Sequence, residues 1–126
     1  MSTCFAAEPQ IFVRNINLSM AFYTQGLGFR EVFLYGEPPF YAQVVRDDAR
    51  LNLRQVDTPV IDPVRQDTDQ LLSASITVDR ARPLFEEFVR AGIDVARPLR
   101  TEPWGACTFI VRDPDGNLLL FAGNVG

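Results

Sequence analysis

The 126-residue chain contains no histidine, which removes a common metal ligand and the side chain most often used for proton transfer near neutral pH. It has only two cysteines, Cys4 and Cys107, which form neither a disulfide framework nor a CxxC metal pair. Neither thiol has a histidine to activate it as a nucleophile. Acid–base chemistry would therefore fall to Glu8, Glu102, Tyr41 or a thiol, residue types that do not titrate near neutrality unless their surroundings shift them.

No stretch of the sequence approaches the roughly 18 apolar residues that a membrane span needs, and the first ten residues lack the regions of a secretory signal. The 12 basic and 16 acidic residues are spread along the chain and give a net charge of -4. A nucleic-acid surface needs concentrated basic side chains, so this distribution argues against one. The sequence predicts a cytoplasmic protein with neither a membrane nor a nucleic-acid partner. Its acidic balance either favours neutral or cationic ligands or simply keeps the protein soluble.

The first half of the chain has the pattern of a strand, a helix and three further strands. Residues 10–14 alternate and indicate a strand, and the segment Asn15 to Asn17 supplies polar cap candidates for a helix over 18–25. Gly26 and Gly28 would end this helix. Three strand-like runs follow, separated by turn sequences. These predicted strands are residues 29–35, 40–46 and 50–56.

The second half repeats this order after a polar connector that contains two prolines and shows no period. Asp79 is the candidate cap of a helix that Gly92 would close. The apolar stripe of this helix is Leu84, Phe85, Phe88 and Ala91. The predicted strands are residues 72–78, 93–99, 106–112 and 118–123.

The matching order of elements indicates a tandem duplication. The similar sequences VVRDD at 44–48 and IVRDPD at 110–115 both precede the last strand of their half. We predict a single α+β domain in which each curved mixed sheet carries a helix on one face, so that the two sheets together form a cleft. The predicted boundaries are 1–126 for the domain, about 8–56 for module one, about 57–70 for the connector and about 71–123 for module two.

The chain resembles the vicinal oxygen chelate superfamily in three segments, residues 13–29, 44–48 and 103–121. This superfamily contains glyoxalase, ring-cleaving dioxygenases, fosfomycin-resistance enzymes and bleomycin-resistance proteins. The specific parts are FYxxxLGF after a capped helix and WG followed by DPDGN, which indicate a fold more strongly than a reaction. Within the superfamily, the resemblance is greatest to bleomycin-resistance proteins, which sequester their ligand rather than transform it. The segments that carry this likeness are FYTQGLGF, VVRDD and EPWG. Phe22 and Tyr23 are interpreted as packing residues between helix and sheet.

Metal-using members of this superfamily coordinate their ion with His, Glu or Gln near the first and last strands of each module. The resemblance places these four positions at Glu8, Asn52, Ser73 and Leu120. Leucine offers no lone pair and serine is a poor ligand, so this set does not suit a catalytic metal. We predict no bound metal or other cofactor and no metal-dependent glyoxalase or dioxygenase chemistry. A hard cation held by Glu8 and water is the alternative.

Alternation assigns one face of each predicted sheet to the helices and leaves the other face free. Ile11, Val13, Leu51 and Leu53 suit the helix side. The free face would carry Gln10, Phe12, Asn52, Arg54, Ser73, Ser75, Thr77 and Leu120. This mixture of apolar and hydrogen-bonding groups is typical of a binding pocket.

Aromatic side chains flank the GEPP turn at 36–39, and Trp104 lies in the EPWG loop. The resemblance matches Trp104 and Tyr41 to aromatic positions of bleomycin-resistance proteins. Core packing is the alternative for Phe33 and Phe40, and a buried ring that fastens the loop is the alternative for Trp104. The predicted ligand-binding residues are Trp104, Tyr41, Glu8, Phe12, Asn52, Arg54, Ser73, Leu120, Phe33 and Tyr35, and no catalytic residue is predicted.

The predicted function is therefore metal-independent binding of a small molecule, with sequestration of a planar or cationic aromatic compound as in antibiotic resistance. One alternative is a lyase, isomerase or dioxygenase-like enzyme of the same superfamily with a non-standard active site, using Glu8 or a tyrosine as base. Another is a protein whose pocket has lost its ligand and which serves as an interaction partner. The resemblance also implies a homodimer, because exposed sheet edges are costly to leave uncovered in so small a domain.

Overall fold

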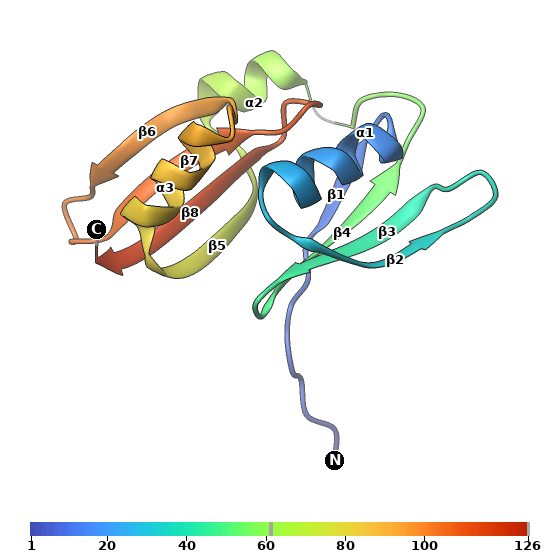
Figure 1. Cartoon of the computed structure of the whole chain (residues 1–126), viewed down its shortest axis with the longest axis horizontal. Helices are drawn as coiled ribbons and strands as arrows, with labels where there is room; N and C mark the ends of the chain where they lie inside the picture. Colours follow the sequence, from blue (N-terminus) through green and yellow to red (C-terminus); the bar gives the residue numbers. More distant parts are fainter. Residues whose placement is uncertain (61, 126) are drawn as a thin grey trace.

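The computed structural model describes residues 1–60 and 62–125, which form two β-α-β-β-β modules with a short helix between them (Figure 1). The first module contains β1 (Gln10–Val13), α1 (Ile16–Ala21), a π-helical turn η1 (Phe22–Gly26), β2 (Arg30–Tyr35), β3 (Tyr41–Arg46) and β4 (Ala49–Gln55). After α2 (Pro63–Asp69), the second module contains β5 (Leu72–Arg80), α3 (Ala81–Arg90), β6 (Val95–Thr101), β7 (Cys107–Arg112) and β8 (Leu118–Val125).

The two sheets have equivalent topologies. Their strand orders are β1-β4-β3-β2 and β5-β8-β7-β6, and in each sheet the first strand pairs in parallel with the last while the other neighbours are antiparallel. The predicted α+β class and the tandem pair of modules are confirmed.

In each module the long helix covers one face of its sheet, and the interior lies between them (Figure 1). The alternation in β1 and β4 is as predicted, since Ile11, Val13, Leu51 and Leu53 are all buried on the helix side. In the second module, Phe88 of α3 packs edge-on against Phe109 and Phe121, which stack on each other with ring centroids 5.2 Å apart. These contacts belong to one apolar core that includes buried residues of both modules.

The first helix begins at Ile16, two residues before the predicted start, because Asn15, one of the candidate caps, accepts a hydrogen bond from the Leu18 amide at 3.1 Å. Its second half widens into the π-helical turn, which contains Tyr23. Gly28, in the FYTQGLGF sequence, has a φ of +77°, which favours glycine. A Cβ atom there would approach the Arg46 guanidinium to 2.7 Å, so the absence of a side chain at Gly28 leaves room for Arg46.

The connector carries α2, which its lack of periodicity did not indicate. Asp62 caps this helix by accepting from the amides of Val64 and Arg65, and Pro63 occupies the first helical turn. Asp67 forms an ion pair with Arg112 at the end of β7, so the helix is tied to the second sheet.

The end of β5 differs from the prediction. The strand continues to Arg80, and this residue, rather than Asp79, precedes α3 as its N-cap without a side-chain capping bond. The Asp79 carboxylate instead accepts from the Arg80 amide at 2.8 Å. Gly92 follows the helix with a φ of +76°, as expected for a helix terminator.

Within the described part of the chain, no helix is both long enough and apolar enough to cross a membrane.

Candidate functional site

The face of the first sheet opposite α1, called the open face of module one, gathers most of the predicted ligand-binding residues. Cross-strand pairs share a side of a sheet, and Phe12 pairs with Arg54, which pairs with Tyr41. Tyr41 also pairs with Tyr35, and Phe33 pairs with Gln43 two residues further along β3. Strand pairing therefore brings Phe12, Phe33, Tyr35, Tyr41, Asn52 and Arg54 to one surface.

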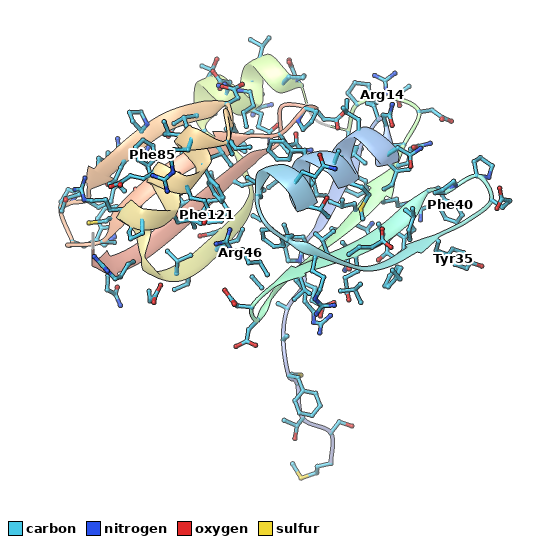
Figure 2. The ribbon with its side chains drawn as sticks, in the orientation of Figure 1. Arg14, Tyr35, Phe40, Arg46, Phe85 and Phe121 are labelled. Carbon is cyan, nitrogen blue, oxygen red and sulfur yellow. The ribbon has the colours of Figure 1, made fainter. Side chains whose placement is uncertain are left out.

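Four aromatic rings cluster at the β2–β3 hairpin, at one end of the molecule (Figure 2). Phe33 and Tyr41 have centroids 5.8 Å apart, and Tyr35 and Phe40 meet edge-on at 5.7 Å. The Arg54 guanidinium lies 6.0 Å from the centre of the Phe40 ring, at the limit of a cation–π contact. Tyr35 is 65% exposed and Phe33 and Phe40 are also exposed, so core packing does not account for these rings.

Polar side chains continue the open face beyond the aromatic cluster. Gln43 donates to Asn52 Oδ1 at 2.9 Å and to Glu8 Oε1 at 3.1 Å, and its own Oε1 accepts from Arg50 at 2.9 Å. Gln43 thus connects two predicted site residues that are 44 positions apart in the sequence. Gln43 was not among the predicted site residues, although its position two residues after Tyr41 places it on the same face.

The second sheet divides its predicted residues between two environments. Leu120 pairs with Ser75, and Thr77 pairs with Ala122, so these side chains share the open face of module two as predicted. Ser73 lies at an irregularity in the β5–β8 pairing, and its hydroxyl bonds Asn117 at 3.1 Å and the Gln66 amide at 3.0 Å.

Trp104 lies in the β6–β7 loop, at the opposite end of the molecule from the β2–β3 hairpin (Figure 1). Its ring is 75% exposed, so it does not fasten the loop by burial. The structure therefore separates Trp104 from Tyr41, Phe33 and Tyr35 within one chain.

The base of this loop is polar and buried. Glu102 lies between Arg97, Arg100 and Thr108, and its carboxylate accepts from Arg100 at 2.7 Å and from Thr108 at 2.8 Å. These two hydrogen bonds hold the pKa of Glu102 below its ordinary value. Burial lowers the pKa of Arg97, and the Arg100 charge adds to this effect.

Among the described residues, four side chains of the second module make polar contacts with the first. Tyr23 donates to Asp113 at 2.9 Å, Asn117 donates to the Phe12 carbonyl at 3.0 Å, and the Arg14 amide donates to Asp115 at 3.0 Å. Arg46 forms a two-pronged ion pair with Glu87 of α3 at 2.8 and 3.1 Å, and in Figure 2 it points toward the second module. These contacts fix where the open faces lie relative to each other.

Burial dominates the electrostatics of the Tyr23–Asp113 contact. It raises the pKa of both side chains, and the Asp113 charge raises the pKa of Tyr23 further. The Glu87 pKa is lowered, because Arg46 donates hydrogen bonds to its charged form.

Hollows lie between the modules in the described part of the chain, and one of them lies beside the Arg46–Glu87 ion pair. A groove of about 930 Å³ runs between the β3–β4 turn and β5, with Ser75 and Thr77 on one wall and Asp47 and Asp48 on the other. A smaller hollow of about 250 Å³ is lined by Phe12 together with residues of the connector and the DPDGN turn.

The residues at the four inferred metal positions do not fit a metal. Glu8 and Asn52 are joined through Gln43 on the first sheet, whereas Ser73 is engaged by Gln66 and Asn117. Leu120 has no donor atom, and nowhere in residues 1–60 and 62–125 do three His, Cys, Asp or Glu side chains gather as metal ligands. The donor set therefore gives no basis for metal-dependent chemistry at these positions.

Several solved structures share this fold. A bleomycin-binding protein from bleomycin-producing Streptomyces verticillus, solved with copper(II)-bleomycin, is 27% identical, and the match covers 100% of this chain and 99% of that chain with a TM-score of 0.74. A bleomycin resistance determinant encoded on the transposon Tn5 is 22% identical, with 96% and 98% covered and a TM-score of 0.78. TioX from Micromonospora sp. ML1 is 18% identical, with 94% and 97% covered and a TM-score of 0.74.

No curated protein sequence matches the chain. The sequence profile of the Glyoxalase/Bleomycin resistance protein/Dioxygenase superfamily matches residues 6–121, nearly the whole chain. This match agrees with the duplicated β-α-β-β-β architecture and with the similar solved structures. The chain belongs to the glyoxalase/bleomycin resistance protein/dioxygenase superfamily.

Proposed function

We propose that this protein binds and sequesters a planar or cationic aromatic compound and releases it chemically unchanged. The observation that carries the proposal is the exposed aromatic cluster on the open face of module one. Phe33, Tyr35 and Phe40 form a solvent-facing patch, and exposed patches of large apolar side chains usually serve recognition. A planar ring can stack on such a surface, while the adjacent Asn52 and Glu8 supply acceptors for a cationic or donor-rich group.

The similarity to a bleomycin-binding protein at 27% identity supports this class of ligand. The net charge of -4 favours a cationic compound over an anionic one. The proposed contact residues are those predicted from the sequence, Glu8, Phe12, Phe33, Tyr35, Tyr41, Asn52, Arg54, Ser73, Trp104 and Leu120, with the addition of Gln43.

We further propose that the binding unit is a homodimer. Trp104 and the aromatic cluster lie at opposite ends of one chain, so a single copy cannot bring them to the same ligand (Figure 1). A second copy that places its Trp104 loop over the open face of module one would complete the site. Sedimentation analysis at micromolar concentration should give about twice the 14.2 kDa chain mass, and a stable monomer would contradict this arrangement.

Calorimetric titration with metal-free bleomycin tests the proposal. Saturable binding is expected, and mass spectrometry should recover the compound unaltered after long incubation. Prior treatment of the protein with EDTA should leave the affinity unchanged. Chemical conversion of bleomycin would contradict sequestration, and absence of binding for both bleomycin and a simple planar cation such as ethidium would contradict the ligand class.

Trp104→Ala and Tyr35→Ala should each weaken the affinity for bleomycin by roughly 1 to 3 kcal/mol, the range for stacking on planar ligands. Both side chains are largely exposed, so thermal stability should change little. Val89→Ala, which truncates an exposed apolar residue on α3, is the matched control and should leave the affinity unaltered. Equal affinity in all three variants would remove the aromatic cluster and Trp104 from the site.

A further inference from the structure

The loop that presents Trp104 combines an exposed ring with a buried carboxylate two residues earlier. Glu102 is 7% exposed, whereas Trp104 is 75% exposed. Removing a carboxylate from water is costly unless charged and hydrogen-bonding partners replace the water. A short surface loop that has such a group at its base is therefore held at that point.

The Glu102 carboxylate has three partners on β6 and β7. Its Oε1 atom accepts from Arg100 Nε at 2.7 Å and from Thr108 Oγ1 at 2.8 Å, and Oε2 lies 3.4 Å from Arg100 Nη2. The Arg97 guanidinium lies 3.6 Å from Oε1 and donates to Thr108 at 2.7 Å. Side chains from both strands that flank the loop thus converge on one carboxylate.

The loop backbone is closed over the same residue. The Glu102 amide donates to the Ala106 carbonyl at 2.7 Å, and the Gly105 amide donates to the Glu102 carbonyl at 2.9 Å. Gly105 has a φ of +100°, a conformation that other residues rarely adopt. Backbone and side-chain contacts of Glu102 therefore define the turn from which Trp104 projects.

These contacts do not serve the packing of the ring itself, because the ring is mostly in solvent. They also leave the buried Arg97 Nε without an acceptor in the described part of the chain. Leaving a buried donor unpaired costs stability. The Glu102 cluster thus includes an unpaired buried donor, which lowers stability, and it lies at the base of a loop with an exposed tryptophan. This combination points to a requirement for a fixed loop geometry.

We infer that Glu102 is a positioning residue that holds the Trp104 loop in one conformation and so prearranges the ring for ligand contact. The inference rests on the proposed function for the role of Trp104 in binding. A ring on a fixed loop loses less conformational freedom on binding than a ring on a mobile loop, and the saved entropy appears as affinity. Glu102 itself does not need to touch the ligand.

The test uses Trp104 as the only tryptophan of the chain, so its fluorescence reports on this loop alone. Glu102→Gln removes the negative charge with little change in size, and Arg100→Gln removes the donor at 2.7 Å from a side chain that is already 55% exposed. Glu86→Gln, an exposed glutamate on α3, is the matched control. Time-resolved anisotropy of Trp104, metal-free bleomycin affinity and thermal stability are measured for each protein.

Both loop variants should increase the fast local motion of Trp104 in the free protein and weaken bleomycin binding by about two- to tenfold. The Glu86→Gln variant should match the wild type in all three measurements. A Glu102→Asp variant, which keeps the charge on a shorter side chain, should recover part of the lost anisotropy.

Unchanged Trp104 anisotropy in both Glu102→Gln and Arg100→Gln would overturn the positioning role, whatever the ligand. Increased motion with unchanged bleomycin affinity would also overturn it, provided that Trp104→Ala weakens binding. If Trp104→Ala itself leaves the affinity unchanged, Trp104 does not contact the ligand, and the proposal that its ring is prearranged for the ligand fails as well. The anisotropy result then still reports whether Glu102 holds the loop. If Glu102→Gln does not fold, Arg100→Gln decides the question.

Discussion

The hydrogen bond between Tyr23 and Asp113 joins residues 90 positions apart and provides a direct test of how the two modules are held together. Tyr23 is fully buried, and its hydroxyl donates to Asp113 Oδ2 at 2.9 Å. Asp113 is also buried and accepts from the amides of Asp115 and Asn117 and from the Asn117 side chain. Tyr23→Phe removes only the hydroxyl and keeps the ring in the core.

The expected loss of unfolding free energy at pH 7 is about 1.5 to 3 kcal/mol, the range for a hydrogen bond to a charged partner. The low end applies if Asn117 satisfies Oδ2 alone, since it already donates to that atom at 2.9 Å. The loss should be smaller at pH 4. The hydrogen bond from the Tyr23 hydroxyl lowers the pKa of Asp113, so it stabilises the charged carboxylate more than the protonated carboxyl. Removal of the hydroxyl therefore costs less unfolding free energy as more of the Asp113 becomes protonated.

Urea unfolding, followed by circular dichroism, measures this loss from the shift in midpoint at constant slope. Tyr35→Phe removes the hydroxyl of a largely exposed tyrosine and should change stability by less than about 0.5 kcal/mol. A Tyr23→Phe variant as stable as Tyr35→Phe at pH 7 would refute the reasoning, because the buried hydrogen bond would then contribute nothing.

Further predictions concern the module junction, the connector and the pH dependence. Arg46→Gln should lower the free energy of unfolding by about 0.5 to 1 kcal/mol, because the Arg46–Glu87 pair is partly exposed. This loss, measured by urea unfolding, should shrink in high salt, unlike any change caused by the control Arg82→Gln. Asp62→Ala should lower the free energy of unfolding by about 1 kcal/mol and speed hydrogen exchange of the α2 amides, because it removes the acceptor for two of them. Unchanged exchange would show that the cap is dispensable. Carboxyl titration by NMR should place the Asp113 midpoint above 3.8 and the Glu87 midpoint below 4.5. An Asp113 midpoint below 3.8 or a Glu87 midpoint above 4.5 would contradict the assigned environment of that residue. Glu87 then adds stability that is present above pH 4.5 and lost as the pH falls, whereas the contribution of Asp113 declines as the pH rises past 3.8.

Local sequence signals determined most of the secondary structure. The apolar alternation of β1 and β4 assigned Ile11 and Leu53 to the helix side, because a strand turns successive side chains to opposite faces. Asn15 marked the start of α1, since its side chain can satisfy a free amide without any tertiary contact. The Asp62–Pro63 pair carried an equally local signal for α2, whereas the helix has too few apolar residues to show a helical period.

Only the tertiary structure decided which predicted site residues share a surface. Alternation assigned Asn52 to the predicted site, and the family resemblance added Tyr41 and Trp104. Neither signal contains information on how far the β2–β3 hairpin lies from the β6–β7 loop. The bridge from Gln43 to Glu8 depends on how β1 is placed beside β4, and the Tyr23–Asp113 contact depends on how two whole modules pack. Such contacts join residues far apart in the chain, so their formation follows from the packed core and not from any local pattern.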